Sequence, residues 1–169
     1  MTLDRSLIGR RYGPFRYHVG LEKLREYALA VAGVEPGIGG WREPTPGLAP
    51  PHVAADSVHG AGEIVAMPMF PVVVAIGAFA SALEDPALGA DLATLVHGEQ
   101  DLELLLPIRP GDVLFTTATL ADLVERGGLG IIVVVTESCD AGGQLVARAR
   151  WTAVWTVRNE IGAKPPDER

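Results

Sequence analysis

The chain has a single cysteine, Cys139, among its 169 residues, so it cannot form a disulfide within itself. A disulfide-stapled secreted domain is therefore excluded, and a reducing compartment suffices. The simplest interpretation of Cys139, in a strand-like segment, is a small buried or half-buried hydrophobe. The N-terminal residues 1–11 have too short an apolar run for a signal peptide, and no later run reaches the roughly 20 apolar residues of a membrane span. We expect a cytoplasmic protein.

Basic residues are also scarce, with 14 lysines and arginines against 21 acidic residues and a net charge of −7. No basic stripe is present, so neither nucleic acid nor an anionic membrane is an expected partner. The four histidines are scattered and show no metal-ligand spacing. A serine nucleophile elbow and a phosphate-binding glycine loop are also missing, and we expect neither a metal nor a cofactor.

The length fits one domain, which we place at residues 1–158, with a polar, disordered tail at 159–169. Near the start, residues 13–19 alternate apolar and polar side chains, which predicts a half-buried strand with His18 on its polar face. From Leu21 the apolar residues recur at helical spacing, which predicts an amphipathic helix that ends at Gly33. The following glycine- and proline-rich residues 34–51 predict a long loop.

Residues 71–83 form the most apolar segment of the chain, PVVVAIGAFASAL. Val72, Val73 and Val74 have strand propensity, but the apolar run extends past the usual length of a strand. We interpret it as a helix that begins at Pro71. Because this helix is apolar nearly all round, other elements must enclose it on most sides.

Four strand-like segments follow, at residues 101–108, 113–125, 130–138 and 145–158, with turn residues between them. The last has the clearest alternation, with Trp151 and Trp155 on one face and Arg148 and Arg150 on the other. An early strand, a central apolar helix and an antiparallel meander predict an α+β domain whose curved sheet wraps a buried helix. This is the hot-dog fold.

Three segments in order resemble the MaoC-like dehydratase N-terminal family, also called the FAS1-like dehydratase domain: LIGRRYGPFRYHVGLEKLREYALAVAG, the proline-rich loop ending AMPMFP, and VHGEQDLELLLPIRPGD. The resemblance implies paired hot-dog domains that hydrate enoyl thioesters or dehydrate 3-hydroxyacyl thioesters of coenzyme A or acyl-carrier protein, in fatty acid or polyketide metabolism.

The resemblance also implies where an acid and a base would lie. Relatives use an aspartate and a histidine in an Asp-x-Asn-Pro-x-His motif ahead of the central helix, and backbone N–H groups at the helix start polarise the thioester carbonyl. Here His52 lies near the place of the motif histidine, and Asp56 and His59 are three residues apart. The full motif is absent, because Gly47 stands five residues before His52 and no Asn-Pro is present. The alternative is that both histidines are surface loop residues.

The same resemblance implies substrate-binding residues at two places. These are Met67, Met69 and Phe70 at the entry of the central helix, and His97 and Glu99 ahead of the strand at 101–108. For the second place the structural alternative is that Gly98 allows a bend while His97 satisfies a backbone group.

Three functions remain open. The first is a hydratase or dehydratase, as a homodimer or as half of a heterodimer. The second is a non-catalytic acyl-binding subunit that stabilises a catalytic MaoC-like partner, and the third is a hot-dog thioesterase. In each case an edge strand and an exposed helix flank predict pairing with a second hot-dog subunit, with the ligand tunnel at the interface.

Overall fold

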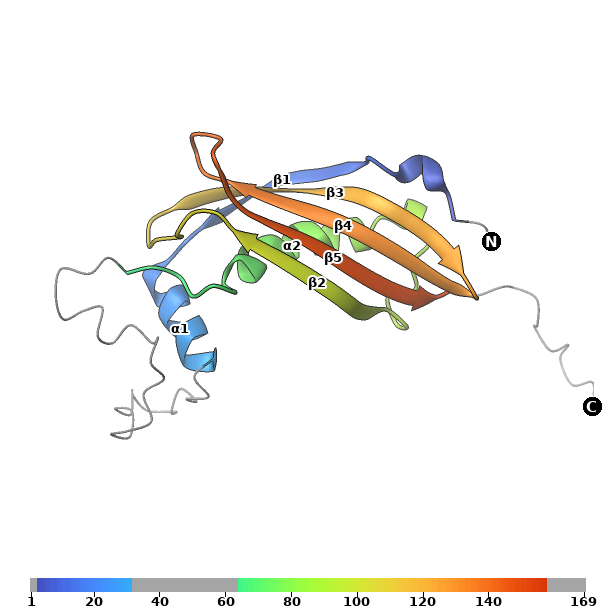
Figure 1. The fold of residues 1–169 in the computed structure, drawn as a ribbon, viewed down its shortest axis with the longest axis horizontal. Helices are drawn as coiled ribbons and strands as arrows, with labels where there is room; N and C mark the ends of the chain where they lie inside the picture. Colours follow the sequence, from blue (N-terminus) through green and yellow to red (C-terminus); the bar gives the residue numbers. More distant parts are fainter. Residues whose placement is uncertain (1–2, 32–63, 158–169) are drawn as a thin grey trace, which may run out of the picture.

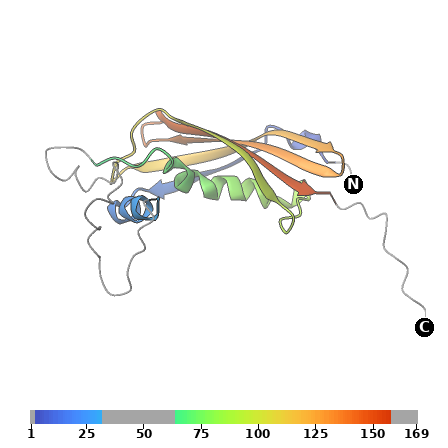
Figure 2. The same cartoon turned by 60° about the horizontal axis from the view of Figure 1, so that its bottom comes forward.

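The computed structural model describes residues 3–31 and 64–157. One antiparallel sheet, with the strand order β1-β3-β4-β5-β2, curves over helix α2, and helix α1 lies at one end of it (Figures 1 and 2). The α+β hot-dog architecture predicted from the sequence is confirmed. The strands are β1 (Arg11–His18), β2 (Val96–Leu104), β3 (Val113–Arg126), β4 (Leu129–Cys139) and β5 (Leu145–Thr156); the helices are α1 (Leu21–Val31), α2 (Pro71–Leu83) and the 3-10 turns η1 (Arg5–Leu7) and η3 (Pro86–Leu88).

The long strands alternate as predicted because one face of the sheet lies against α2. On β5, Trp151 and Trp155 are each 1% exposed, whereas Arg148 and Arg150 point to solvent from the opposite face. The β3–β4 hairpin turns at Gly127 and Gly128, which both have positive φ. Two successive left-handed residues define the tight turn that matches the twist of paired strands, so glycine is the natural residue at both positions.

Helix α2 begins at Pro71 and ends at Leu83, the bounds predicted from the sequence. The sheet covers the face that carries Val74, Ala78 and Ala82, and these side chains are buried. The opposite flank is open, since Ile76 is 47% exposed and Gly77 is also exposed. Within the described residues, the expected enclosure on most sides is therefore not met on this flank, where α2 leaves apolar surface exposed.

The strand predicted at residues 101–108 is shifted, because β2 begins five residues earlier, at Val96, and ends at Leu104. Polar residues in VHGEQ hid its first half from the hydrophobic pattern. They are compatible with a strand here because β2 lies at the edge of the described sheet, where β5 is its neighbour. The other predicted strands and helix α1 are confirmed within a few residues of their predicted ends.

The helix start and α1 are joined by an aromatic cluster. Phe70 is fully buried, and its ring lies edge to face with two tyrosine rings. The ring centroids are 6.3 Å apart for Tyr17 of β1 and 5.5 Å apart for Tyr27 of α1. Leu24 of α1 is buried in the same apolar cluster. These contacts fix the start of α2 against β1 and α1.

Among the described residues, no helix has the length and apolar character that crossing a membrane requires.

Candidate functional site

The three residues proposed from the sequence as acid and base, His52, Asp56 and His59, lie outside the described residues, as does the predicted tail at 159–169. Their catalytic role stays a prediction. The described part of the chain contains His18 and His97, and within that part neither forms a hydrogen bond or an ion pair with a carboxylate. The described residues also hold no group of three or more possible metal ligands.

The predicted binding residues at the entry of α2 differ in exposure. Met67 is half-buried and Met69 is 49% exposed, whereas Phe70 is fully buried among aromatic rings. Phe70 therefore reaches no solvent-filled space in the single chain, and its contacts anchor the helix. The role of all three in substrate binding stays a prediction.

The first backbone N–H groups of α2 already have acceptors. Phe70 donates to the carbonyl of Met67 at 2.9 Å, Val72 to Met69 at 3.1 Å, and Val73 to Phe70 at 2.9 Å. Pro71 has no N–H to offer. The amides of Phe70, Val72 and Val73, which the resemblance would direct at a thioester carbonyl, are thus engaged within the chain. The dipole of α2 still favours negative charge at this end of the helix.

His97 and Glu99 lie within β2, not ahead of it, and they face opposite sides of the sheet. A bulge at Gly98 places His97 opposite Ala153 and Glu99 opposite the next residue of β5, Thr152. Since Ala153 is buried on the helix side, His97 shares that side, and Glu99 points outward. Sequence spacing alone would put His97 and Glu99 on the same side of the sheet, because residues two apart on a regular strand share a face.

An aromatic stack lies beneath His97. The rings of Phe79, from α2, and Trp151, from β5, stack with centroids 4.7 Å apart, and the imidazole lies 6.1 Å and 5.8 Å from them. The Nε2 atom of His97 lies 3.2 Å from the backbone carbonyl oxygen of Glu99. This contact and the bulge match the structural alternative for this motif, a bend at Gly98 and a histidine that satisfies a backbone group.

Gln100 was not singled out from the sequence, although it belongs to the same VHGEQ motif. It pairs with Trp151 across the strands, so its side chain lies on the helix side with that of His97. Its amide nitrogen Nε2 is shielded from solvent and has no hydrogen-bond partner in the described part of the chain. A donor of this kind costs free energy unless it finds an acceptor, which a ligand or partner could supply. The sequence did not indicate this role, because the bulge at Gly98 decides on which side of the sheet Gln100 lies, and no sequence pattern reveals the bulge.

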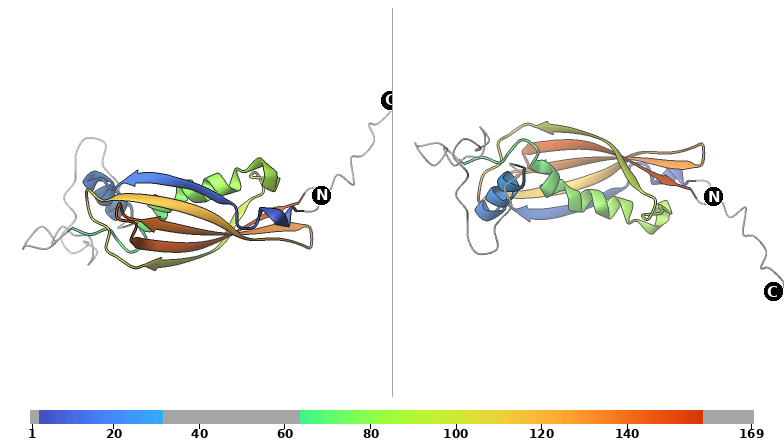
Figure 3. Two further views of the ribbon diagram at one scale, coloured as in Figure 1. Left: turned by 90° about the horizontal axis from the view of Figure 1, so that it is seen from above. Right: turned by 90° about the horizontal axis from the view of Figure 1, so that it is seen from below.

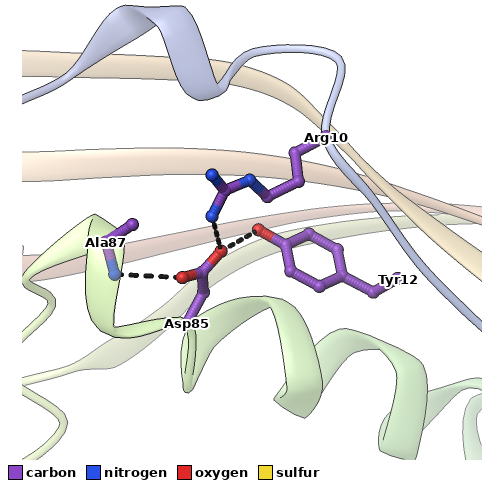
Figure 4. A network of polar contacts seen from close by, with 4 residues as sticks. All are labelled: Arg10, Tyr12, Asp85 and Ala87. Carbon is purple, nitrogen blue, oxygen red and sulfur yellow. Dashed lines mark hydrogen bonds and ion pairs between the residues drawn. The ribbon is translucent and has the colours of Figure 1, made fainter.

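A second polar cluster, at the far end of α2, was also missed. Asp85 accepts hydrogen bonds from Arg10 at 2.5 Å, from the Tyr12 hydroxyl at 2.8 Å and from the backbone of Ala87 at 2.9 Å (Figure 4). The Arg10 guanidinium, more than the other two donors, lowers the pKa of Asp85. Burial, assisted by the bond to Asp85, raises the pKa of Tyr12 to about 12. The cluster ties β1 to the end of α2, away from the helix start.

Comparisons with known proteins agree with this geometry. The family described as "FAS1-like, dehydratase domain region" matches residues 6–149. A UPF0336 protein of Streptomyces coelicolor is 35% identical over 153 residues, which is 90% of this chain and 93% of the relative. A UPF0336 protein of a Parafrankia species is 31% identical over 167 residues, 98% of this chain and 99% of the relative.

Solved structures show the same fold. The truncated HadBC (3R-hydroxyacyl-ACP dehydratase) complex of Mycobacterium tuberculosis aligns with a TM-score of 0.63 at 24% identity, over 91% of this chain and 99% of that one. A MaoC-like dehydratase aligns with a TM-score of 0.66 at 26% identity, over 94% of this chain but only 45% of that one. The family match covers most of the chain, and the curved sheet over α2 is the architecture of these neighbours, so the chain belongs to the FAS1-like dehydratase domain family, with the hot-dog fold of MaoC-like dehydratases.

Proposed function

We propose that this chain is a subunit of a hydro-lyase that adds water to enoyl thioesters, or removes it from 3-hydroxyacyl thioesters, carried by coenzyme A or acyl-carrier protein. The observation that carries the proposal is the dehydratase family match over residues 6–149 on a sheet that covers one face of α2. The HadBC complex is named for such a reaction, which supports the substrate class.

Pairing with a second hot-dog subunit is part of the proposal. Among the described residues, Ile76 and Gly77 are exposed on one flank of α2, and β2 is an edge strand of the sheet. The chain covers 45% of the MaoC-like dehydratase, so that protein has length for a second domain of similar size. An acyl chain would lie where the two subunits meet, near His97 and Gln100 on the inner side of β2.

One observation favours the non-catalytic form of this subunit. The reaction needs an acid, a base and donors for the thioester oxygen. In the described residues the amides at the start of α2 are engaged, and no histidine is paired with a carboxylate. The candidates for an acid and a base of this chain's own are His52, Asp56 and His59, which lie outside the described residues, and the partner is the alternative source.

The test is an assay of the purified full chain with crotonyl-coenzyme A, following the loss of enoyl thioester absorbance. Hydration by the chain alone that disappears in His52→Ala or His59→Ala identifies a catalytic subunit. Activity that appears only when a MaoC-like subunit from the same genome is added identifies a non-catalytic one. Absence of hydration in both cases, with release of free thiol from an acyl-coenzyme A, refutes the proposal in favour of a thioesterase.

A further inference from the structure

Among the described residues, β1 and β2 are the two edge strands of the sheet, and they differ in how well they can accept another strand. The pairing of β1 is broken by a register shift between Tyr12 and Phe15, and Pro14 in that gap has no N–H group. The β2 strand has one bulge, at Gly98, and then pairs regularly with β5 through Leu104. A regular edge with which no other described strand pairs, such as Glu99 to Leu104, is the natural template for a second chain.

The outward face of this edge is acidic. Glu99, Asp101 and Glu103 are all exposed and lie at alternate positions, so they point to the same side of the sheet, away from α2. Opposite them on β5 are Thr152, Arg150 and Arg148, which occupy the outer face of that strand. The sheet is viewed from this outer side and from below in Figure 3, with β2 at its margin.

The neighbouring arginines neutralise this row only in part. Arg148 lies 2.8 Å from Glu137 of β4 but 3.8 Å from Glu103, so its closer ion pair is with β4. Glu99 faces Thr152, which carries no charge. Along the row that contains Arg148, the charge on the outer face alternates from strand to strand, with Glu137 on β4, Arg148 on β5 and Glu103 on β2. A partner strand added beside β2 would therefore complement this charge if its outward residues were basic.

A second copy of the chain is a poor match for this edge. In an antiparallel pair, residues that face each other lie on the same side of the sheet. Two β2 strands related by a two-fold axis would therefore set the acidic row of one copy beside that of the other, in every register in which the rows overlap. Like charges in directly opposite positions destabilise a strand pair.

We propose that the β2 edge, through Glu99, Asp101 and Glu103, selects a different hot-dog subunit whose edge strand carries lysine or arginine at alternate outward positions. This inference rests on the proposed function, since it names the partner that completes the hydro-lyase. The partner is then a hetero-subunit with a basic edge, and the acidic row acts against self-pairing. The partner's strand also approaches the unmatched amide of Gln100 on the inner side of β2.

The experiment compares the full chain with a neutral variant, E99Q/D101N/E103Q. A matched control, E22Q/E26Q/E125Q, removes three exposed carboxylates elsewhere, so both variants change the net charge equally from −7 to −4. Molar mass is measured by sedimentation velocity in about 0.1 M and about 1 M NaCl, where the Debye length is about 10 Å and about 3 Å. Thermal unfolding verifies that each variant is folded.

The neutral variant is expected to dimerise with an affinity roughly tenfold higher than that of the unaltered chain or the control at the lower salt concentration. The difference in dimerisation affinity is expected to narrow at the higher salt concentration, because salt screens the repulsion between the acidic rows. A second variant, E99K/D101K/E103K, supplies a basic edge, and its mixture with the unaltered chain is expected to form a heterodimer that weakens with salt. The control lysine variant, E22K/E26K/E125K, is expected not to do so.

An unaltered chain that forms a dimer as tight as that of the neutral variant, independent of salt, would overturn the inference. So would a failure of the neutral variant and of the mixed chains to associate, or growth of the unaltered chain into larger assemblies through β1. Hydration of crotonyl-coenzyme A with an added MaoC-like subunit is measured separately. Hydration without the expected charge dependence of pairing would refute this inference alone, whereas absence of hydration would count against the proposed function.

Discussion

Gly130 of β4 has no room for a side chain, because the ring of Trp155 occupies the space that a Cβ atom would need. Gly130 pairs with Trp155 of β5, and the indole lies over the glycine. A Cβ atom added at Gly130 would lie 2.4 Å from both Cε2 and Cζ2 of Trp155, whereas ordinary contacts begin at 3.4 Å. Because Trp155 is 1% exposed, the ring has no solvent into which to move. The Gly130→Ala change must therefore shift packed side chains or the backbone.

We expect Gly130→Ala to lower the free energy of unfolding by about 2–3 kcal/mol, within the range for overpacked cores. For a domain of this length that is a decrease in Tm of about 4–12 °C. The matched control is Gly77→Ala in α2, where an added Cβ meets nothing within 4 Å. Better helix propensity should raise its unfolding free energy by about 1 kcal/mol.

Thermal and urea unfolding, followed by circular dichroism and by the fluorescence of buried tryptophan, measure both variants. Equal stability of Gly130→Ala and the unaltered chain would contradict the placement of Trp155 over Gly130. A loss of stability in Gly77→Ala would instead mean that this helix flank is already occupied in the isolated chain.

Three further predictions concern stability and pairing. Removing the Asp85 charge with Asp85→Asn should cost about 1–2 kcal/mol at pH 7, because Arg10 loses its charged acceptor. The pKa of Asp85 is lowered in the folded state, so the stability difference between the two proteins is fully present above the ordinary pKa of aspartate. It should vanish as acid protonates the carboxyl of the folded protein. Unfolding free energies measured from pH 7 downward must therefore converge. The Ile76→Glu change should leave the unfolding free energy of the isolated chain within about 0.5 kcal/mol while preventing association with a hot-dog partner in size-exclusion chromatography, and retained association would show that this flank is not the contact. The Phe79→Ala change removes a buried ring stacked on Trp151 and should cost about 3–5 kcal/mol in chemical unfolding, so a cost under about 1 kcal/mol would contradict the stack.

Much of the architecture could be predicted from the sequence because it depends on local patterns. The apolar run from Pro71 to Leu83 gave both ends of α2, since proline favours the first turn and the run is too long for a strand. Alternation on β5 located its buried face, and paired glycines located the β3–β4 turn. The family resemblance was visible in the order of three segments, and the match over residues 6–149 confirms it.

The candidate site was less predictable, because it depends on how strands pair. The sequence by itself determined that His97, Gly98, Glu99 and Gln100 stand together, but a pattern of period two assigns His97 and Glu99 to one face. Only pairing with β5 decided that a bulge at Gly98 sends them to opposite faces and puts Gln100 beside the core. Local side-chain chemistry fixes which elements form, whereas the register between distant strands, a property of the whole sheet, fixes which side each residue faces.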